Sequence, residues 1–330
     1  MALLEVKDLH TVFETPAGTV KAVSGVSFSL ERGKVLGIVG ESGSGKSVTA
    51  YSILQILEKS GRILSGSIKL DGQELVGAGE KVLKEIRGNR ISIIFQDPMT
   101  SLNPTYTIGH QLVEAVLLHT QRNRRQAYDR AVEMLGLVGV NEPKKRMKQY
   151  PHEFSGGMRQ RVMIAMALAC EPDLLIADEP TTALDVTIQA QILELMEKLK
   201  QEMGMAILMI THDLGVVAQM CDEVIVMYAG SICEQGRVED IFDNPRHAYT
   251  RGLLRSLPSA EEGSGKLRPI AGTPIDLLNM PKGCPFAPRC EEAMKICLKE
   301  RCQRMQVGDG HSAACWLNVK EGHKHEKRPD

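Results

Sequence analysis

A glycine-rich stretch at residues 40–47, GESGSGKS, limits what this chain can fold into more than any other feature. It fits the pattern G-x-x-x-x-G-K-[ST] and directly follows KVLGIV, an apolar run of the kind that forms a strand buried on both faces. Helical spacing begins at its last two residues. A strand, a glycine-rich turn and a helix start in this order can surround a phosphate with backbone N–H groups. The stretch therefore predicts a phosphate-binding loop on an α/β fold.

Each residue type in this loop has a predicted role. Gly40, Gly43 and Gly45 let the backbone turn its N–H groups inward without Cβ clashes. Lys46 supplies a positive charge to the β- and γ-phosphates, and the Ser47 hydroxyl is a ligand for Mg²⁺. The other predicted nucleotide contacts in the loop and first helical turn are Ser42, Ser44 and Val48. An ordinary glycine-rich turn is the alternative, but it would not account for the spacing, the Lys-Ser ending and the flanking elements together.

A second predicted site lies in the sequence LLIADEP, residues 174–180. Its apolar residues predict a buried strand that ends at Asp178 and Glu179, at the sheet edge where open α/β folds bind ligands. Because adjacent residues of a strand point to opposite sides, the two carboxylates are predicted to act differently. Asp178 is expected to hold Mg²⁺ and its waters, and Glu179 to face the γ-phosphate and polarise the attacking water. Two solvated acids at a strand end are the alternative.

Apolar runs alternate with helical patterns along the chain, which predicts a mostly parallel sheet with helices on its faces. Residues 3–12 and 20–30 alternate apolar and polar positions, which adds an N-terminal antiparallel β part. We expect a helical subdomain inserted at about 97–160. The apolar runs lie at 34–40, 91–95, 174–178, 206–211 and 223–228, and the helical patterns at 46–57, 109–137, 156–170, 187–202 and 214–220.

With FSGGMRQR at 154–161 the chain resembles the ATPases of ABC transporters, whose signature motif begins a helix before the acidic strand. The other family motifs appear in order. Gln96 in IIFQDP resembles the Q-loop residue, ALD at 183–185 the D-loop, and His212 in ITHD the switch histidine. Phe13 stands where the family usually has an aromatic that stacks on adenine. The resemblance covers residues 1–240, predicted to be the ATPase domain.

The resemblance also implies how these residues act. The Ser155-Gly156-Gly157 helix start would cap the γ-phosphate held by a partner ATPase, so that two subunits enclose two nucleotides, and Asp185 would cross the dimer interface. Gln96 would bridge the Mg²⁺ shell and the inserted helices, and His212 would contact the γ-phosphate. The predicted catalytic residues are Glu179, His212 and Lys46.

The chain departs from the family signature at two positions beside the Ser-Gly-Gly core. Phe154 replaces the usual Leu, and Met158 replaces the usual Gln. Both flank the core without entering it, so we interpret them as a subfamily variation and expect a hydrolytically competent site.

Two further stretches, QDPMTSLNPTYTIG at 96–109 and NPRHAYTRGLLRSLP at 244–258, resemble the importer ATPases for oligopeptides and dipeptides. That resemblance implies peptide uptake through two separate permease subunits, with an extracytoplasmic solute-binding protein and usually a second, paralogous ATPase. The chain would then be peripheral, at the cytoplasmic face of the cell membrane. Importers of nickel or another small solute are the nearest alternative. A non-transport ABC ATPase is less favoured, since the chain has one ATPase half.

Composition excludes several other classes. Lys and Arg number 40 against 41 Asp and Glu, so no nucleic-acid partner is expected. No run of 18 apolar residues is free of charge, which argues against a membrane-spanning exporter. The N-terminal MALLEVKDLH carries charges where a signal peptide needs an apolar stretch, so we expect a chain that stays in the cytoplasm. Thiols are reduced there, and clustered cysteines then predict metal before disulfides.

Five of the eight cysteines lie between residues 284 and 315, in a segment too short to order itself by apolar burial alone. Four thiolates suit either zinc or an iron–sulfur cluster, and the peptide-importer resemblance implies a [4Fe–4S]-binding extension. Zinc is the second choice, and disulfides or free thiols remain. We expect residues 241–330 to form a small irregular domain behind a linker, independent of the phosphate loop. The predicted ligands are Cys284, Cys290, Cys297 and Cys315, with Cys302 left over.

Overall fold

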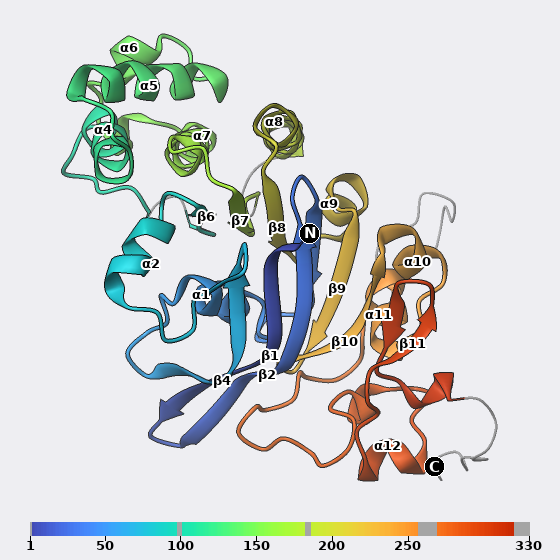
Figure 1. Ribbon diagram of the computed structural model, residues 1–330. Helices are drawn as coiled ribbons and strands as arrows, with labels where there is room; N and C mark the ends of the chain where they lie inside the picture. Colours follow the sequence, from blue (N-terminus) through green and yellow to red (C-terminus); the bar gives the residue numbers. More distant parts are fainter. Residues whose placement is uncertain (1, 98–100, 182–185, 257–268, 320–330) are drawn as a thin grey trace. The chain divides into compact units, whose positions relative to one another are not determined.

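The computed structural model describes residues 2–97, 101–181, 186–256 and 269–319 (Figure 1). The chain divides into two compact units, and each is described by itself. The first unit comprises Met1–Leu4, Ser29–Val35 and Lys69–Ile210. The second comprises Glu5–Phe28, Leu36–Ile68 and Thr211–Asp330.

Three parallel strands form the centre of the first unit. β7 (Leu174–Asp178) pairs with β6 (Ile91–Ile94) on one side and with β8 (Ala206–Thr211) on the other. Every residue of β7 and β8 is buried. Continuous apolar runs form such strands because both of their faces are covered, and the predicted strands at 91–95, 174–178 and 206–211 are confirmed.

Helices make up most of the rest of the first unit. α4 (Ile108–His119), α5 (Arg124–Leu137) and α7 (Gly156–Leu168) pack on one another, as Figure 1 shows. The single helical pattern predicted at 109–137 is therefore two helices. The helix is interrupted because Asn123 is the N-cap of α5. Asn123 forms a capping box with Gln126, and this starts a new helix at that point. The other helices of this unit are α2 (Glu80–Ile86), α6 (Pro143–Arg146) and α8 (Val186–Met203).

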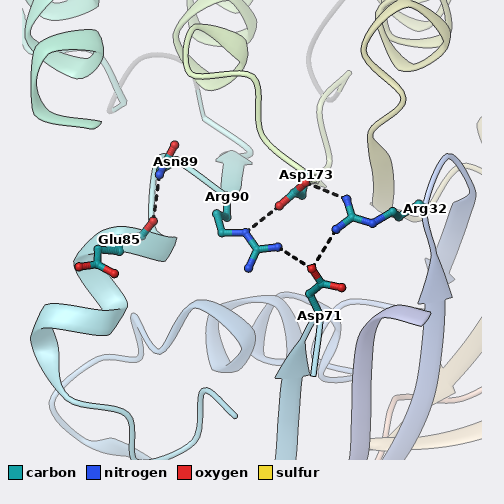
Figure 2. Close-up of polar contacts among 6 residues, drawn as sticks. All are labelled: Arg32, Asp71, Glu85, Asn89, Arg90 and Asp173. Atoms are coloured by element: carbon teal, nitrogen blue, oxygen red, sulfur yellow. Dashed lines mark hydrogen bonds and ion pairs between the residues drawn. The ribbon is translucent and has the colours of Figure 1, made fainter. Parts of the chain in front are cut away.

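A ring of four charged side chains fixes the starts of β6 and β7 (Figure 2). Asp173, directly before β7, accepts hydrogen bonds from Arg90 Nε at 2.7 Å and from Arg32 Nη1 at 2.8 Å. Asp71 closes the ring, because its Oδ2 lies 3.1 Å from Arg32 Nη2 and 3.3 Å from Arg90 Nη2. Each guanidinium bridges the two carboxylates with charge-assisted hydrogen bonds, and such a network holds its geometry more firmly than single ion pairs do. The ring thus anchors two strands whose other ends carry predicted site residues.

The N-terminal β part contains long strands. β1 (Ala2–Thr15) and β2 (Gly18–Glu31) are sheet neighbours, and β4 (Gly61–Leu70) lies on the other side of β1. The short β5 (Gln73–Glu74) pairs with β4 in antiparallel register. The predicted strands at 3–12 and 20–30 are confirmed, and β4 was missed because its exposed residues outnumber its buried ones.

The second unit has its own parallel pair, β3 (Val35–Val39) and β9 (Glu223–Tyr228). β10 (Ser231–Arg237) continues from β9 in antiparallel register. The helices of this unit are α1 (Lys46–Leu54), α9 (Leu214–Met220), α10 (Val238–Asp243), α11 (Ala248–Arg255) and α12 (Lys295–Lys299). The predicted strands at 34–40 and 223–228 and the helices at 46–57 and 214–220 are confirmed.

The C-terminal segment departs from the expectation of an irregular appendage. β11 (Met305–Gly308) and β12 (His311–Ala313) form a hairpin, and β12 pairs with β10. Buried His311 lies 2.8 Å from the buried carboxylate of Glu234, which also accepts the backbone N–H groups of Arg246 and His247. A buried carboxylate must find such partners because desolvation penalises its charge. Glu234 thus joins this segment to β10 and α11.

No helix within the described residues is both long and apolar enough to cross a membrane.

Candidate nucleotide site

The phosphate loop begins where β3 ends and closes where α1 begins. Gly40, Gly43 and Gly45 have φ of +153°, +76° and +100°, values that favour glycine. A Cβ at Gly40 would lie 2.2 Å from the carbonyl oxygen of Met227, and one at Gly45 would lie 2.5 Å from that of Ala22. These two glycines therefore serve the close approach of neighbouring backbone as well as the turn. A Cβ built at Gly43 would meet no atom within 4 Å, so this side of the loop has room for a ligand.

Polar groups of the loop point to an anionic ligand. Lys46 is buried, and its Nζ donates to the carbonyl oxygens of Gly40 at 2.7 Å and Glu41 at 3.0 Å. Ser44 Oγ is buried and has no hydrogen-bond partner among the described residues. A buried hydroxyl without a hydrogen-bond partner lowers the stability of the folded protein. A phosphate oxygen bound in the loop would supply the missing partner. The loop therefore fits the phosphates of a nucleotide.

His212 and Phe13 lie in the same unit as the loop. His212 is exposed and stands between the last residue of β8 and Asp213, whose side chain caps α9 by accepting the N–H of Gly215 at 2.8 Å. Phe13 is half-buried on β1, and a Cβ at Gly61 would lie 2.6 Å from its ring. Gly61 thus leaves room for the ring. The contacts predicted for both residues with nucleotide stay predictions, as does the role of half-buried Ser47.

The acidic residues lie at the carboxyl end of β7 in the first unit. Asp178 is 1% exposed, and Glu179 directly after it has φ +49°, a strained value for a residue with a Cβ. The Glu179 N–H donates to the carbonyl oxygen of Ile210 at 2.8 Å. Gln96 Nε2 donates to Glu179 Oε2 at 2.9 Å, so the structure brings the predicted Q-loop residue and the predicted base together. The buried carboxylate of Asp178 offers oxygen ligands of the kind that Mg²⁺ prefers.

The signature residues form a helix start on the surface of the first unit. Ser155 is the N-cap of α7, and both Ser155 and Gly156 are exposed. The Ser155 hydroxyl accepts the Met158 N–H at 3.4 Å. Phe154 is 3% exposed, with the Arg146 guanidinium 5.9 Å from its ring centroid. The Phe154 departure is therefore a core residue beside the motif. Asp185 lies outside the described residues.

Three polar contacts were missed by sequence reasoning. Buried Gln160 of α7 donates to the carbonyl oxygen of Pro180 at 2.6 Å and so links the signature helix to the turn after Glu179. Arg289 forms an ion pair with Glu41 of the phosphate loop, and the Glu41 N–H donates to the Tyr249 hydroxyl. Only the opposite charges of Glu41 and Arg289 could have suggested their pairing, and 248 residues separate them.

The cysteines of the C-terminal segment are near one another but do not form a metal site. Burial, with a smaller contribution from nearby Cys297 and Cys315, raises the pKa of the Cys284 thiol to about 11. Burial likewise raises the pKa of Cys290 to about 11, with Cys315 and Cys284 adding to the rise. None of the eight cysteines forms a disulfide within the described part of the chain. Among the described residues, no three Cys, His, Asp or Glu side chains are placed to hold a metal ion. The predicted [4Fe–4S] or zinc site is therefore not supported by this geometry.

Comparison with known proteins decides the family. The ABC transporter family model matches residues 23–182, and the model named oligopeptide/dipeptide transporter, C-terminal region, matches residues 233–297. The chain is 52% identical over 316 residues to the dipeptide transport ATP-binding protein DppD of Bacillus subtilis, which covers 96% of this chain and 94% of that protein. The chain belongs to the oligopeptide/dipeptide ABC transporter ATPases.

Other relatives agree with this assignment. The transporter ATPase is 55% identical over 320 residues to the oligopeptide transport ATP-binding protein OppD of Escherichia coli, covering 97% of this chain and 94% of that protein. A solved dimer of the ATP-binding cassette MJ0796, bound to ADP and Pi in a post-hydrolysis state, matches with a TM-score of 0.65 and 26% identity. That match covers 71% of this chain and 98% of the other. The transporter ATPase thus has the mixed α/β fold of ABC ATPases.

Proposed function

We propose that this chain uses MgATP held by residues 40–47 to power the uptake of dipeptides and oligopeptides through separate permease subunits. It is the ATP-hydrolysing subunit of a peptide ABC importer. The phosphate loop carries the proposal for the site, because it combines glycines without room for a Cβ, buried Lys46 and the unsatisfied hydroxyl of Ser44. The peptide cargo is supported by the names of the relatives, and nickel or another small solute remains the rival cargo.

Each residue of the proposed site has its own role in hydrolysis. Ser47, Asp178 and Gln96 would hold Mg²⁺, which neutralises charge on the β- and γ-phosphates when bound. The Lys46 ammonium supports the same phosphates, and His212 contacts the γ-phosphate. Glu179 takes a proton from the attacking water on its carboxylate. The hydrogen bond from Gln96 holds Glu179 Oε2 and so orients this base.

We infer that a second, homologous ATPase completes each site. The exposed start of α7, with Ser155 as its N-cap, offers backbone N–H groups at the positive end of a 13-residue helix. Ser155, Gly156 and Gly157 would cap a γ-phosphate held by that subunit, and Asp185 would cross the interface. The importer would also contain two permease subunits and an extracytoplasmic solute-binding protein, with this chain at the cytoplasmic face of the membrane.

The experiment for the transport function is purification of the tagged protein from native membranes, followed by ATPase assays of the complex in proteoliposomes. Hydrolysis stimulated by a peptide-loaded binding protein supports peptide import. Stimulation by a nickel-loaded binding protein, with none by peptide, would establish the rival cargo instead.

We also propose that Cys284, Cys290, Cys297 and Cys315 bind a [4Fe–4S] cluster, with zinc as the second choice. Support comes from the thiol donors themselves and from their nearness, since Cys297 and Cys315 help to raise the pKa of Cys284, and Cys315 and Cys284 that of Cys290. Their placement does not fit a metal, so the thiols would have to move together on binding. Anaerobically purified protein should be brown and contain iron and sulfide. One zinc per chain would contradict the cluster.

A further inference from the structure

Glu41, the second residue of the phosphate loop, is held by contacts on all of its polar groups. Its N–H donates to the hydroxyl of fully buried Tyr249 at 2.8 Å. Its carbonyl oxygen accepts Lys46 Nζ at 3.0 Å and the Ser44 N–H at 3.2 Å. Its carboxylate accepts two hydrogen bonds from Arg289, Nη1 to Oε2 at 2.5 Å and Nη2 to Oε1 at 2.8 Å. Nothing in phosphate binding requires an acid here, so the position of Glu41 needs another explanation.

Arg289 comes from the C-terminal cysteine segment, in the sequence GCPFAPRC. Its side chain is 6% exposed, and its guanidinium carbon lies 5.8 Å and 5.9 Å from the ring centroids of Tyr228 and Phe286. Nε donates to the carbonyl oxygen of Ala271 at 3.0 Å, and Nη1 to the Tyr228 hydroxyl at 3.3 Å. Packing and hydrogen bonds to groups other than Glu41 therefore hold the guanidinium in place. A planar donor fork held in this way binds one carboxylate orientation.

The contacts form a chain from the cysteine segment to the phosphate-binding groups. Arg289 fixes the Glu41 carboxylate, and the Glu41 backbone in turn holds Lys46 Nζ and the Ser44 N–H. Removing one partner of a largely buried ion pair leaves the other charge poorly solvated, which destabilises the position that this residue holds in the pair. If Arg289 were lost, Glu41 would turn outward and its backbone would shift. Lys46 and Ser44 belong to the groups predicted to meet the phosphates.

We propose that Arg289 is a positioning residue of the nucleotide site, through which the C-terminal cysteine segment sets the shape of the phosphate loop. The inference rests on the proposed role of residues 40–47 in holding ATP. It also replaces the expectation that the C-terminal segment is independent of the loop, because Arg289 of that segment forms an ion pair with Glu41 of the loop.

The test compares Arg289→Gln with Arg251→Gln in the full-length chain. Arg251 of α11 pairs with Glu292, so it ties the same cysteine segment down without touching the loop. The dissociation constant of MgATP, kcat, KM and thermal unfolding are measured for both. We expect Arg289→Gln to weaken MgATP binding and raise KM at least about tenfold, as for loss of a charged hydrogen bond, with a smaller change in kcat. Arg251→Gln should stay within about twofold of the parent.

Arg289→Lys and Tyr249→Phe keep the test decisive if Arg289→Gln is poorly folded, and a double change tests the coupling. Arg289→Lys retains the charge but not the fork and should recover part of the affinity. Tyr249→Phe removes only the hydroxyl that accepts the Glu41 N–H, and it should also weaken MgATP binding. Adding Glu41→Gln to Arg289→Gln should cost less than the sum of the single changes, because no unpaired charge is left.

The outcomes separate this inference from the site assignment. Lys46→Ala should abolish MgATP binding, and if it does not, residues 40–47 are not the nucleotide site. If Lys46→Ala fails to bind while Arg289→Gln binds like Arg251→Gln, the site stands and the positioning role is wrong. Additive effects of the Glu41 and Arg289 changes would also overturn it.

Discussion

Gln96 Nε2 donates a hydrogen bond to Glu179 Oε2 across 2.9 Å, joining the residues that follow two paired parallel strands. Because β6 and β7 pair in register from Ile91 with Leu174 to Ile94 with Ala177, their carboxyl ends lie together. Gln96 was expected at the Mg²⁺ shell and the inserted helices. Its hydrogen bond to Glu179 means that the predicted Q-loop residue also contacts the predicted base directly and can orient its carboxylate.

Glu179→Gln should lower the ATP turnover number by roughly 10²–10⁴-fold, the range for lost general-base catalysis, because an amide cannot take the proton from water. MgATP binding should be retained, since Glu179 is not a phosphate-binding group. Steady-state hydrolysis and equilibrium nucleotide binding check both statements. Glu171→Gln, which changes an exposed acid of the same unit paired with Arg122, serves as the matched control. Near-parental turnover by Glu179→Gln would show that the base is another group.

Gln96→Ala should lower kcat by about 10- to 100-fold, as expected for a lost hydrogen bond to a charged group, while KM for MgATP changes less. The physical reason is that the Glu179 carboxylate loses the donor that orients it. Combining Gln96→Ala with Glu179→Gln should add little to the second change alone, because both act on one step. Independent, multiplying effects on kcat would contradict the coupling.

Stability should fall in mild acid because of His247. Burial lowers the pKa of this histidine to about 4, with Arg251 adding to the shift, from an ordinary value of about 6.5. Between these values the unfolded chain binds a proton that the folded chain does not, so the free energy of unfolding decreases as pH falls. The loss should reach up to about 3 kcal/mol near pH 4.

The matched variant for this prediction is His247→Asn. Nδ1 of His247 accepts the Tyr249 N–H at the start of α11, and asparagine can cap a helix in the same way without titrating. Urea unfolding at several pH values from 7 to 4 should show a shallower decline for His247→Asn. Equal pH slopes for parent and variant would contradict the assignment.

Asp173→Asn should destabilise the first unit by about 1–2 kcal/mol, because Arg32 and Arg90 both lose a charged acceptor at a half-buried site. Burial alone would raise the pKa of Asp173, but hydrogen bonds and the charges of the two arginines lower it overall. Its contribution should therefore be lost as pH falls through the acid range. Asp129→Asn, a change at an exposed position of α5, should leave the unfolding midpoint unchanged. An equal effect of both changes would mean that the ring does not stabilise the strands.

The strands of the parallel sheet were predictable because their residues are buried on both faces and so form unbroken apolar runs, as in LLIAD at 174–178. The loop at 40–47 was predictable because its conformation demands glycine at fixed spacing. The break between α4 and α5 was harder to find, since the cap at Asn123 interrupts a pattern of continuous helical spacing.

Contacts between distant segments could not be found from sequence patterns. The three-residue strand β12 is too short to give a period of its own, and its place beside β10 depends on the buried pair of His311 and Glu234. Gln96 and Glu179 are separated by 83 residues, and their hydrogen bond follows from strand pairing. The Arg289–Glu41 contact likewise depends on how the whole second unit packs.

The central claim is that residues 40–47 hold a triphosphate, and the most direct measurement is a structure of the protein with Mg²⁺ and a non-hydrolysable ATP analogue. Lys46 Nζ, which donates to the carbonyl oxygens of Gly40 at 2.7 Å and Glu41 at 3.0 Å, should also contact the β- and γ-phosphates, because an ammonium group has three donors. The Ser44 hydroxyl and the loop N–H groups should also bind phosphate oxygens. Nucleotide bound elsewhere, with no phosphate oxygen in contact with Lys46 Nζ, would contradict the account.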